Sequence, residues 1–313
     1  MFERLKLFFT FFDSRFEDLN KKNWKVTVYR DFSAGLITAM TAIPMAMGFA
    51  MASGLRPEQG IIAGAIACIV GRTFGGSKYQ VYGPTAAFIP LIASIMQSYD
   101  HSFLVFVSCI AGIILMIMGL TGMGKIAKWV PESVVVGFTV GIAVAIALSN
   151  AGDALGFRSP IEGGLIKKIS SIATHFNELN PYALLLAVLT FALTKGLLRV
   201  SIFIPAPLIA IAVSTGLAVT AFADKGIVFV KDKYGSIPHN FFKFTPPALP
   251  AMQASVIFDM IYFVVAIVFI SGVESLLCSS MADKLAKNKK TPFNPDKEFW
   301  GQRWVLLDLI VTN

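Results

Sequence analysis

Residue types that build disulfide frameworks, metal sites and charged surfaces are scarce in this chain. Its 313 residues include three cysteines, three histidines and only 15% charged residues. The cysteines lie far apart in apolar segments and form no CxxC pair, which indicates buried, inert thiols. The histidines fit no metal-ligand spacing. The chain is therefore interpreted as neither a disulfide-stapled domain nor a metalloprotein.

Sequence patterns of common catalytic and nucleotide-binding sites are also missing. There is no GxSxG, no HExxH, no P-loop, and no GxGxxG placed on a turn between a strand and a helix. Without an ATP-binding motif, ATP-driven transport by this chain is not expected. No catalytic constellation supports an enzyme, and no organic cofactor is predicted.

Apolar sequence, in contrast, is abundant. Hydrophobic residues make up 55% of the chain and the mean hydropathy is +0.68, values typical of a polytopic membrane protein rather than a soluble domain. We predict an all-α membrane protein. Its predicted membrane-entering segments cover residues 34–54, 58–75, 79–97, 102–121, 133–150, 181–198, 202–222 and 254–278, and a last, weaker segment begins near residue 298.

The distribution of basic residues predicts how the chain lies in the membrane. With the N-terminus inside, most of the 27 Lys and Arg residues fall in inside segments, as the positive-inside rule requires. Residues 1–30 are charged and amphipathic, without a signal-peptide cleavage site, and are interpreted as a cytosolic interfacial segment. We expect an integral protein of a plasma or inner membrane with a cytoplasmic N-terminus. The net charge of +8 indicates anionic inner-leaflet lipid as a partner, and no motif suggests nucleic acid.

The stretch between the second and fourth predicted segments has a different pattern. Residues 79–82 are predicted to form a short strand, after which Gly83 and Pro84 suit a tight turn and the first position of a helix. The following helix, from Thr85 to about residue 97, is roughly 20 Å long and too short to cross a ~30 Å hydrocarbon core. Its free N–H groups and positive dipole end would then face the bilayer midplane, as in transporters that hold anions.

Two other segments carry residues that could line a site. In the first segment Pro44 lies mid-helix, and Phe49 either lines a site or belongs to an ordinary apolar lining. In the segment at 254–278, Glu274 stands near the end of an apolar run. An ionisable residue inside a membrane marks a functional site by default. Glu274 could bind a cation, carry a proton, fix helix geometry, or lie solvated at the interface.

With these residues placed, the chain resembles the SulP anion transporter family, the sulfate permease group that includes bicarbonate transporters. The resemblance covers most of residues 28–302 and is carried by the order and spacing of several passages. These passages are Asp-Phe-Ser-Ala-Gly-Leu at 31–36, Ile-Pro at 43–44, Pro-Glu-Gln-Gly at 57–60, Val-Tyr-Gly-Pro-Thr-Ala at 81–86 and Glu-Ser-Leu-Leu at 274–277. A weaker passage follows at 294–302.

The resemblance implies a seven-plus-seven inverted-repeat fold divided into a core and a gate domain. Residues 31–222 would form the first repeat, 223–253 an extracytoplasmic loop and 254–313 the start of the second repeat. Half-helices in the third and tenth segments would face one anion site. Transport of sulfate, bicarbonate or another small inorganic anion or carboxylate would follow an elevator-like movement of core against gate. Family members are often dimers, so a homodimer is one expected assembly.

The resemblance also implies the site residues. The substrate-binding residues would be Met45, Phe49, Gly83, Pro84, Thr85 and Ala86. Glu274 and Cys278 would face them from the eighth segment as the position of a coupling Na+ or H+. The resemblance also implies that sodium-coupled members of the family have Asp and Thr at these two positions. The thiol that this chain has in place of Thr is a poor ligand for a hard cation. H+ coupling through Glu274 is therefore comparatively favoured, although the sequence does not decide between H+ and Na+.

The resemblance leads us to expect that the second repeat is almost absent, because the sequence stops at Asn313 soon after an apolar stretch at 304–312 begins. We therefore expect that this chain does not transport unless another polypeptide supplies the second repeat. Two alternatives stay open. One is a nucleobase-type carrier of related fold, and the other is a non-transporting truncated membrane remnant.

Overall fold

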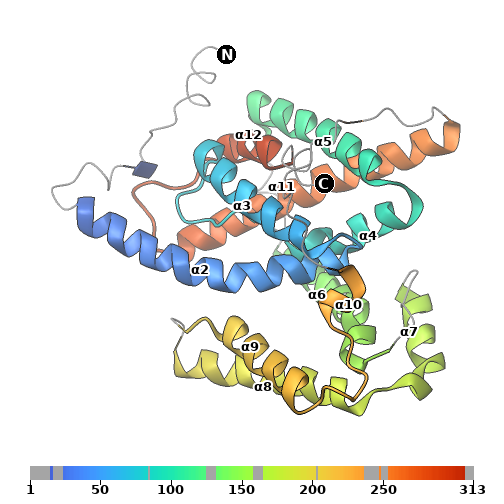
Figure 1. The fold of residues 1–313 in the computed structure, drawn as a ribbon. Helices are drawn as coiled ribbons and strands as arrows, with labels where there is room; N and C mark the ends of the chain where they lie inside the picture. Colours follow the sequence, from blue (N-terminus) through green and yellow to red (C-terminus); the bar gives the residue numbers. More distant parts are fainter. Residues whose placement is uncertain are drawn as a thin grey trace.

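The computed structural model describes residues 15–16, 24–83, 85–124, 132–157, 165–201, 204–235, 247 and 253–306. These residues are mostly helical (Figure 1). The longer helices are α2 (Trp24–Ala52), α3 (Pro57–Phe74), α5 (His101–Thr121), α6 (Glu132–Leu155), α8 (Pro181–Val200), α9 (Ala206–Thr220), α11 (Ala254–Leu285) and α12 (Pro295–Leu306). The shorter elements are the 3₁₀ turn η2 (Ala86–Phe88), α4 (Ile89–Ser98), α7 (Leu165–Thr174), the 3₁₀ turn η4 (Phe176–Glu178) and α10 (Val230–Tyr234).

Each apolar segment predicted from the sequence contains a helix, and local signals mark several helix ends. The side chain of Asn180 caps α8 by accepting hydrogen bonds from the N–H groups of Tyr182 and Ala183 at 3.0 and 3.4 Å. Asp100 caps α5 in the same way. Helix α5 ends at Gly122, whose φ of 82° is the left-handed conformation that glycine adopts readily.

Three features differ from the sequence prediction. The strand expected at 79–82 is not formed: no strand occurs within the described ranges, so no neighbour there supplies ladder hydrogen bonds. Helix α7 is not anticipated by hydropathy, because Lys167 and Lys168 interrupt its apolar run. In addition, α2 begins at Trp24, inside the expected N-terminal segment. The last segment, expected from near 298, is described only to the end of α12 at Leu306, and its remainder lies outside the described residues.

Four of the described helices are long and apolar enough to cross a membrane, judged by length and composition: α2, α5, α8 and α11. The apolar helices at Ala86–Ser98 and Ala206–Thr220 are shorter. Large apolar side chains on the long helices face outward, among them Phe32, Phe191 and Phe258. Such a surface would be exposed to water in a soluble protein but suits contact with lipid tails.

The helices form two groups (Figure 1). One group contains α2, α3, α4, α5, α11 and α12, with α12 packed along α5 and α3. The other contains α6, α8 and α9, and in it α8 and α9 lie side by side. Thr190 of α8 and Ser214 of α9 share a hydrogen bond of 2.6 Å. The two groups touch where α2 contacts α6 and α9, and where α6 contacts α4 and η2.

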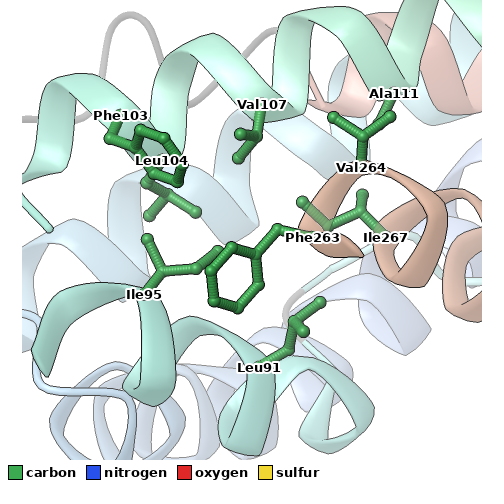
Figure 2. Packing of buried hydrophobic residues seen from close by; sticks show 9 residues of the cluster. All are labelled: Leu91, Ile95, Phe103, Leu104, Val107, Ala111, Phe263, Val264 and Ile267. Carbon is green, nitrogen blue, oxygen red and sulfur yellow. The ribbon is translucent and has the colours of Figure 1, made fainter. Parts of the chain in front are cut away.

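The apolar centre of the first group lies among α4, α5 and α11 (Figure 2). Its buried members are Leu91, Ile95, Phe103, Leu104, Val107, Ala111, Phe263, Val264 and Ile267. The rings of Phe103 and Phe263 meet edge to face, with centroids 6.2 Å apart and planes at 82°. Helix α4 is thus anchored by its apolar side chains, and this packing holds its N-terminal end in place.

Candidate functional site

The N-terminal end of the short helical segment is organised by Thr85. Its backbone is extended (φ −122°, ψ 141°), and its Oγ1 accepts a hydrogen bond from the N–H of Ala87 at 3.3 Å. This is the geometry of a helix N-cap, which satisfies one of the N–H groups that a helix start leaves without a partner. The 3₁₀ turn η2 follows and leads directly into α4.

Thr85 also contacts α11, because its hydroxyl donates a hydrogen bond to Oε1 of Glu274. Glu274 is half-buried, and α11 packs against η2. The structure therefore brings together two of the predicted site residues from segments that are 189 positions apart. Cys278 lies one turn further along α11, on the same face as Glu274, and is exposed. Within the described ranges, no group of three or more His, Cys, Asp or Glu residues could hold a metal ion.

Two of the other predicted site residues, Gly83 and Ala86, lie on either side of Thr85 in the chain. Gly83 is half-buried, and apart from its chain neighbours no atom of the described residues lies within 4 Å of the position that a Cβ would take there. The φ of Gly83 is not in the left-handed region, so the turn does not require glycine for its backbone conformation. Ala86 is the first residue of η2. Pro84 lies outside the described residues.

Met45 and Phe49 come from α2, which contacts α4. Helix α2 continues through Pro44, and its buried residues Ala46 and Ala50 pack closely against Gly60 of α3. Met45 is exposed and Phe49 is half-buried. These two residues share a different face of α2, turned about 100° from the face that packs on α3.

The structure adds a polar cluster that the sequence alone did not assign to a site. The buried carboxylate of Glu298 on α12 accepts hydrogen bonds from the Gly76 N–H at 2.8 Å, the Tyr82 hydroxyl at 2.7 Å and the Ser275 hydroxyl at 2.6 Å. Gln302, one turn further along α12, donates to the Ser275 hydroxyl at 2.8 Å. The signals in the sequence are the weaker family-like passage at 294–302 and the spacing of Glu298 and Gln302, which places both on one helix face.

Four of the described helices are long and apolar enough to cross a membrane, which indicates an integral, multi-pass membrane protein. Residues 28–304 match the Sulfate permease family, and the chain belongs to that family. YvdB from Bacillus subtilis (strain 168), whose name provisionally assigns it to sulfate transport, is 34% identical over 292 residues, which cover 93% of this chain and 53% of YvdB. The bicarbonate transporter BicA from Picosynechococcus is 26% identical over 284 residues, which cover 87% of this chain and 48% of BicA.

Solved structures show the same fold. The transmembrane domain of a cyanobacterial bicarbonate transporter BicA superimposes with a TM-score of 0.73 at 24% identity, covering 89% of this chain and 70% of that domain. The structure of SLC26A9 gives a TM-score of 0.77 at 19% identity, covering 94% of this chain and 50% of SLC26A9. The chain thus spans about half the length of the curated relatives that it matches.

Proposed function

We propose that the chain forms part of a secondary transporter of small inorganic anions or carboxylates, of the sulfate or bicarbonate class. The observation that carries the proposal is the hydrogen bond between Thr85, at the start of a short helical segment, and Glu274 of α11. It joins a helix N-terminus to a carboxylate within one packed group of helices. The names of YvdB and BicA, which concern sulfate and bicarbonate, support this substrate class.

The anion is proposed to bind at the start of the η2–α4 segment. A helix start offers free N–H groups and the positive end of the helix dipole, both of which favour negative charge. Gly83, Pro84, Thr85 and Ala86 would supply this end of the site. The position of a Cβ on Gly83 is free of atoms from the described residues other than its chain neighbours, which would let an anion approach the backbone there. Met45 and Phe49 would line the site from α2.

Transport is proposed to follow an elevator-like movement of the first helix group against the second. The short helical segment and α11 belong to the same group, so a bound anion would move together with both. The second group, with α6, α8 and α9, would stay in place as the gate. The contacts between the groups involve α2, α4, α6, α9 and η2, which are the surfaces that would slide.

Glu274 is proposed as the residue that couples anion movement to a cation, with Cys278 one turn away. H+ is favoured over Na+, because a carboxyl that hydrogen-bonds a hydroxyl can take up and release a proton, whereas a thiol is a poor ligand for Na+. The proposal also includes a homodimer, anionic inner-leaflet lipid as a partner, and a location in a plasma or inner membrane with the N-terminus in the cytoplasm.

Orientation is testable by cysteine accessibility in intact cells. In a chain whose native cysteines are replaced by serine, Lys225→Cys is expected to react with a membrane-impermeant maleimide from outside. Lys290→Cys should react only after permeabilisation, because the basic run after α11 belongs inside. Both lysines are exposed, so burial does not confuse the comparison. Labelling of Lys290→Cys in intact cells would reverse the proposed topology.

Anion flux tests the function itself. Uptake of labelled sulfate and bicarbonate into proteoliposomes is measured for the 313-residue chain and for this chain joined to the part of YvdB that it does not match, called the completed chain below. We expect flux only from the completed chain. Flux from the 313 residues alone would contradict that expectation, and no anion flux from either would remove the proposed function.

Thr85 provides the site-specific variant in the completed chain. Thr85→Ala removes both the cap on Ala87 and the hydrogen bond to Glu274, and we expect the apparent affinity for the anion to fall about tenfold, since a charge-assisted hydrogen bond contributes about 1.5–3 kcal/mol. Thr85→Ser keeps the hydroxyl and should transport nearly as well as the parent. Equal affinities for the alanine and serine variants would show that the hydroxyl has no part in binding.

A further inference from the structure

Glu298 is a charged side chain placed where solvent does not reach it. It is fully buried, and its carboxylate accepts hydrogen bonds from Gly76, Tyr82 and Ser275. Burying a carboxylate opposes folding unless donors surround it, and apolar residues of similar size often stabilise a fold at least as well. We therefore infer that this buried carboxylate, with its three donors, does more than fill space in the core.

The donors come from two parts of the chain that are far apart in the sequence. Gly76 and Tyr82 belong to the irregular segment 75–83, and Ser275 belongs to α11. Glu298 on α12 thus bonds both at once. We call these four residues, together with Gln302, the Glu298 clamp. Gln302 adds a hydrogen bond to the Ser275 hydroxyl and thereby fixes its orientation toward the carboxylate.

The clamp holds the same two segments that meet at the candidate anion site. Ser275 directly follows Glu274 on α11, and Tyr82 shortly precedes Thr85. The hydrogen bond between Thr85 and Glu274 therefore lies next to the clamp along both segments. A shift of segment 75–83 relative to α11 would change the clamp and the Thr85–Glu274 contact together.

Close backbone packing supports this arrangement. A Cβ on Gly76 would lie 2.8 Å from the backbone nitrogen of Glu298, and one on Gly301 would lie 2.7 Å from the backbone nitrogen of Gly75. Real Cβ atoms essentially never come that near, so only glycines allow α12 to lie against the segment. The chain has no strand beside residues 79–82 in the part that the structure describes. Instead of a neighbouring strand, the carboxylate of Glu298 accepts hydrogen bonds from this segment, from the Gly76 N–H and the Tyr82 hydroxyl.

We propose that Glu298 is a positioning residue for the anion site, which holds segment 75–83 against α11 so that Thr85 and Glu274 meet. The inference rests on the proposed function for its effect on anion affinity. The claim that Glu298 holds segment 75–83 against α11 does not rest on the proposed function, because the position of the segment can be measured without transport.

Two readouts test the clamp. The first is cross-linking of Gln80→Cys to Ser279→Cys by a short bifunctional thiol reagent in the 313-residue chain with its native cysteines replaced by serine. The side chains of Gln80 and Ser279 hydrogen-bond each other, so this pair reports how segment 75–83 lies on α11. The second is the KM and Vmax of anion uptake by the completed chain. The thermal unfolding midpoint in detergent is recorded for every variant.

The clamp variants are Glu298→Gln, which keeps the shape and removes the charge, and Tyr82→Phe, which removes one donor. A third clamp variant, Ser275→Ala, removes a donor on α11. Its matched control is Ser271→Ala on the same helix, which removes a buried hydroxyl that has no hydrogen-bond partner among the described residues. Tyr79→Phe, at an exposed position of the same segment, is the control for Tyr82→Phe.

We expect the clamp variants to cross-link several-fold more slowly and to raise KM about tenfold with little change in Vmax, as loss of one charge-assisted hydrogen bond predicts. The controls should behave like the parent. Clamp variants that only lower the unfolding midpoint, with cross-linking and KM unchanged, would overturn the proposal. If Glu298→Gln does not fold, Tyr82→Phe decides. If no chain transports any anion, the proposed function and the positioning role fall, and the cross-linking rates then decide only whether Glu298 holds the segment.

Discussion

Replacing Gly60 with alanine is expected to push α2 and α3 apart and to destabilise the protein strongly. A Cβ at Gly60 would lie 2.8 Å from the Cβ of Ala50 and would collide with the backbone carbonyl of Ala46. Ala46 and Ala50 are buried, so they cannot move aside without shifting α2. In lipid, helices associate mainly through close packing, which small residues permit.

The size of the effect follows from overpacking. Forcing an extra methyl group into a tight interface typically costs about 1–3 kcal/mol, and the collision here involves backbone atoms, so we expect the upper part of that range. The measurement is the thermal unfolding midpoint in detergent, together with the fraction of protein that elutes as a single species. Gly60→Ala should lower both.

Gly48→Ala is the matched control, because it adds the same methyl group to α2 at a position where no atom of the described neighbouring residues lies within 4 Å of it. Alanine favours a helix over glycine by about 1 kcal/mol, so this variant should be as stable as the parent or slightly more stable. Equal destabilisation by the two substitutions would show that the close approach at Gly60 does not hold the helices together.

The helical framework is predictable from the sequence because its signals are local. Long apolar runs specify the spans, and single residues such as Asp100, Gly122 and Asn180 mark where helices begin and end. A helix satisfies its own backbone hydrogen bonds, so its formation depends little on which segment lies beside it. The short helical segment after Thr85 was predictable for the same reason, since a cap and a following apolar run suffice.

Features that depend on distant partners were not predictable in this way. A strand at 79–82 requires a neighbour, and the described part of the chain offers none. The burial of Glu298 could not be predicted either. A run containing Asp296, Lys297 and Glu298 has the composition of an exposed helix, yet Lys297 and Glu298 are buried. Their environment is created by α3, α5 and α11, which pack around α12.

The candidate site is intermediate between these cases. The sequence indicated Thr85 as a helix start and Glu274 as an intramembrane carboxylate, each for a local reason. That the two side chains hydrogen-bond each other is a tertiary fact, set by the packing of α4, α5 and α11 in the apolar centre (Figure 2). The binding and coupling roles of these residues stay predictions, which transport measurements must test.

Glu274→Gln is expected to abolish accumulation of anion against a gradient in the completed chain while leaving exchange of anion for anion intact. The amide has nearly the shape of the carboxyl, and its oxygen can still accept the hydrogen bond from Thr85. It cannot take up a proton or carry a negative charge for Na+. The substitution therefore removes coupling and leaves the local geometry in place.

The measurement compares uptake driven by a pH gradient, uptake driven by a Na+ gradient, and counterflow of labelled anion without either gradient. We expect the parent to respond to the pH gradient and the glutamine variant to respond to neither, with counterflow of both chains within about twofold. A parent that responds to Na+ alone would reassign the coupling ion and keep Glu274 as its residue.

Asp259→Asn is the control, because Asp259 is another carboxylate on α11, where it accepts a hydrogen bond from the hydroxyl of Tyr99. Neutralising it should leave gradient-driven uptake unchanged, since it lies far along the helix from Glu274 and about 1.5 Å of rise separates successive residues. Accumulation by Glu274→Gln at the level of the parent would show that coupling does not pass through this carboxyl. Glu274→Asp then distinguishes the effect of the charge from the effect of side-chain length, because it keeps the charge but is one methylene shorter. If coupling needs the contact with Thr85 as well as the charge, the aspartate variant should accumulate anion to a level between the parent and the glutamine variant.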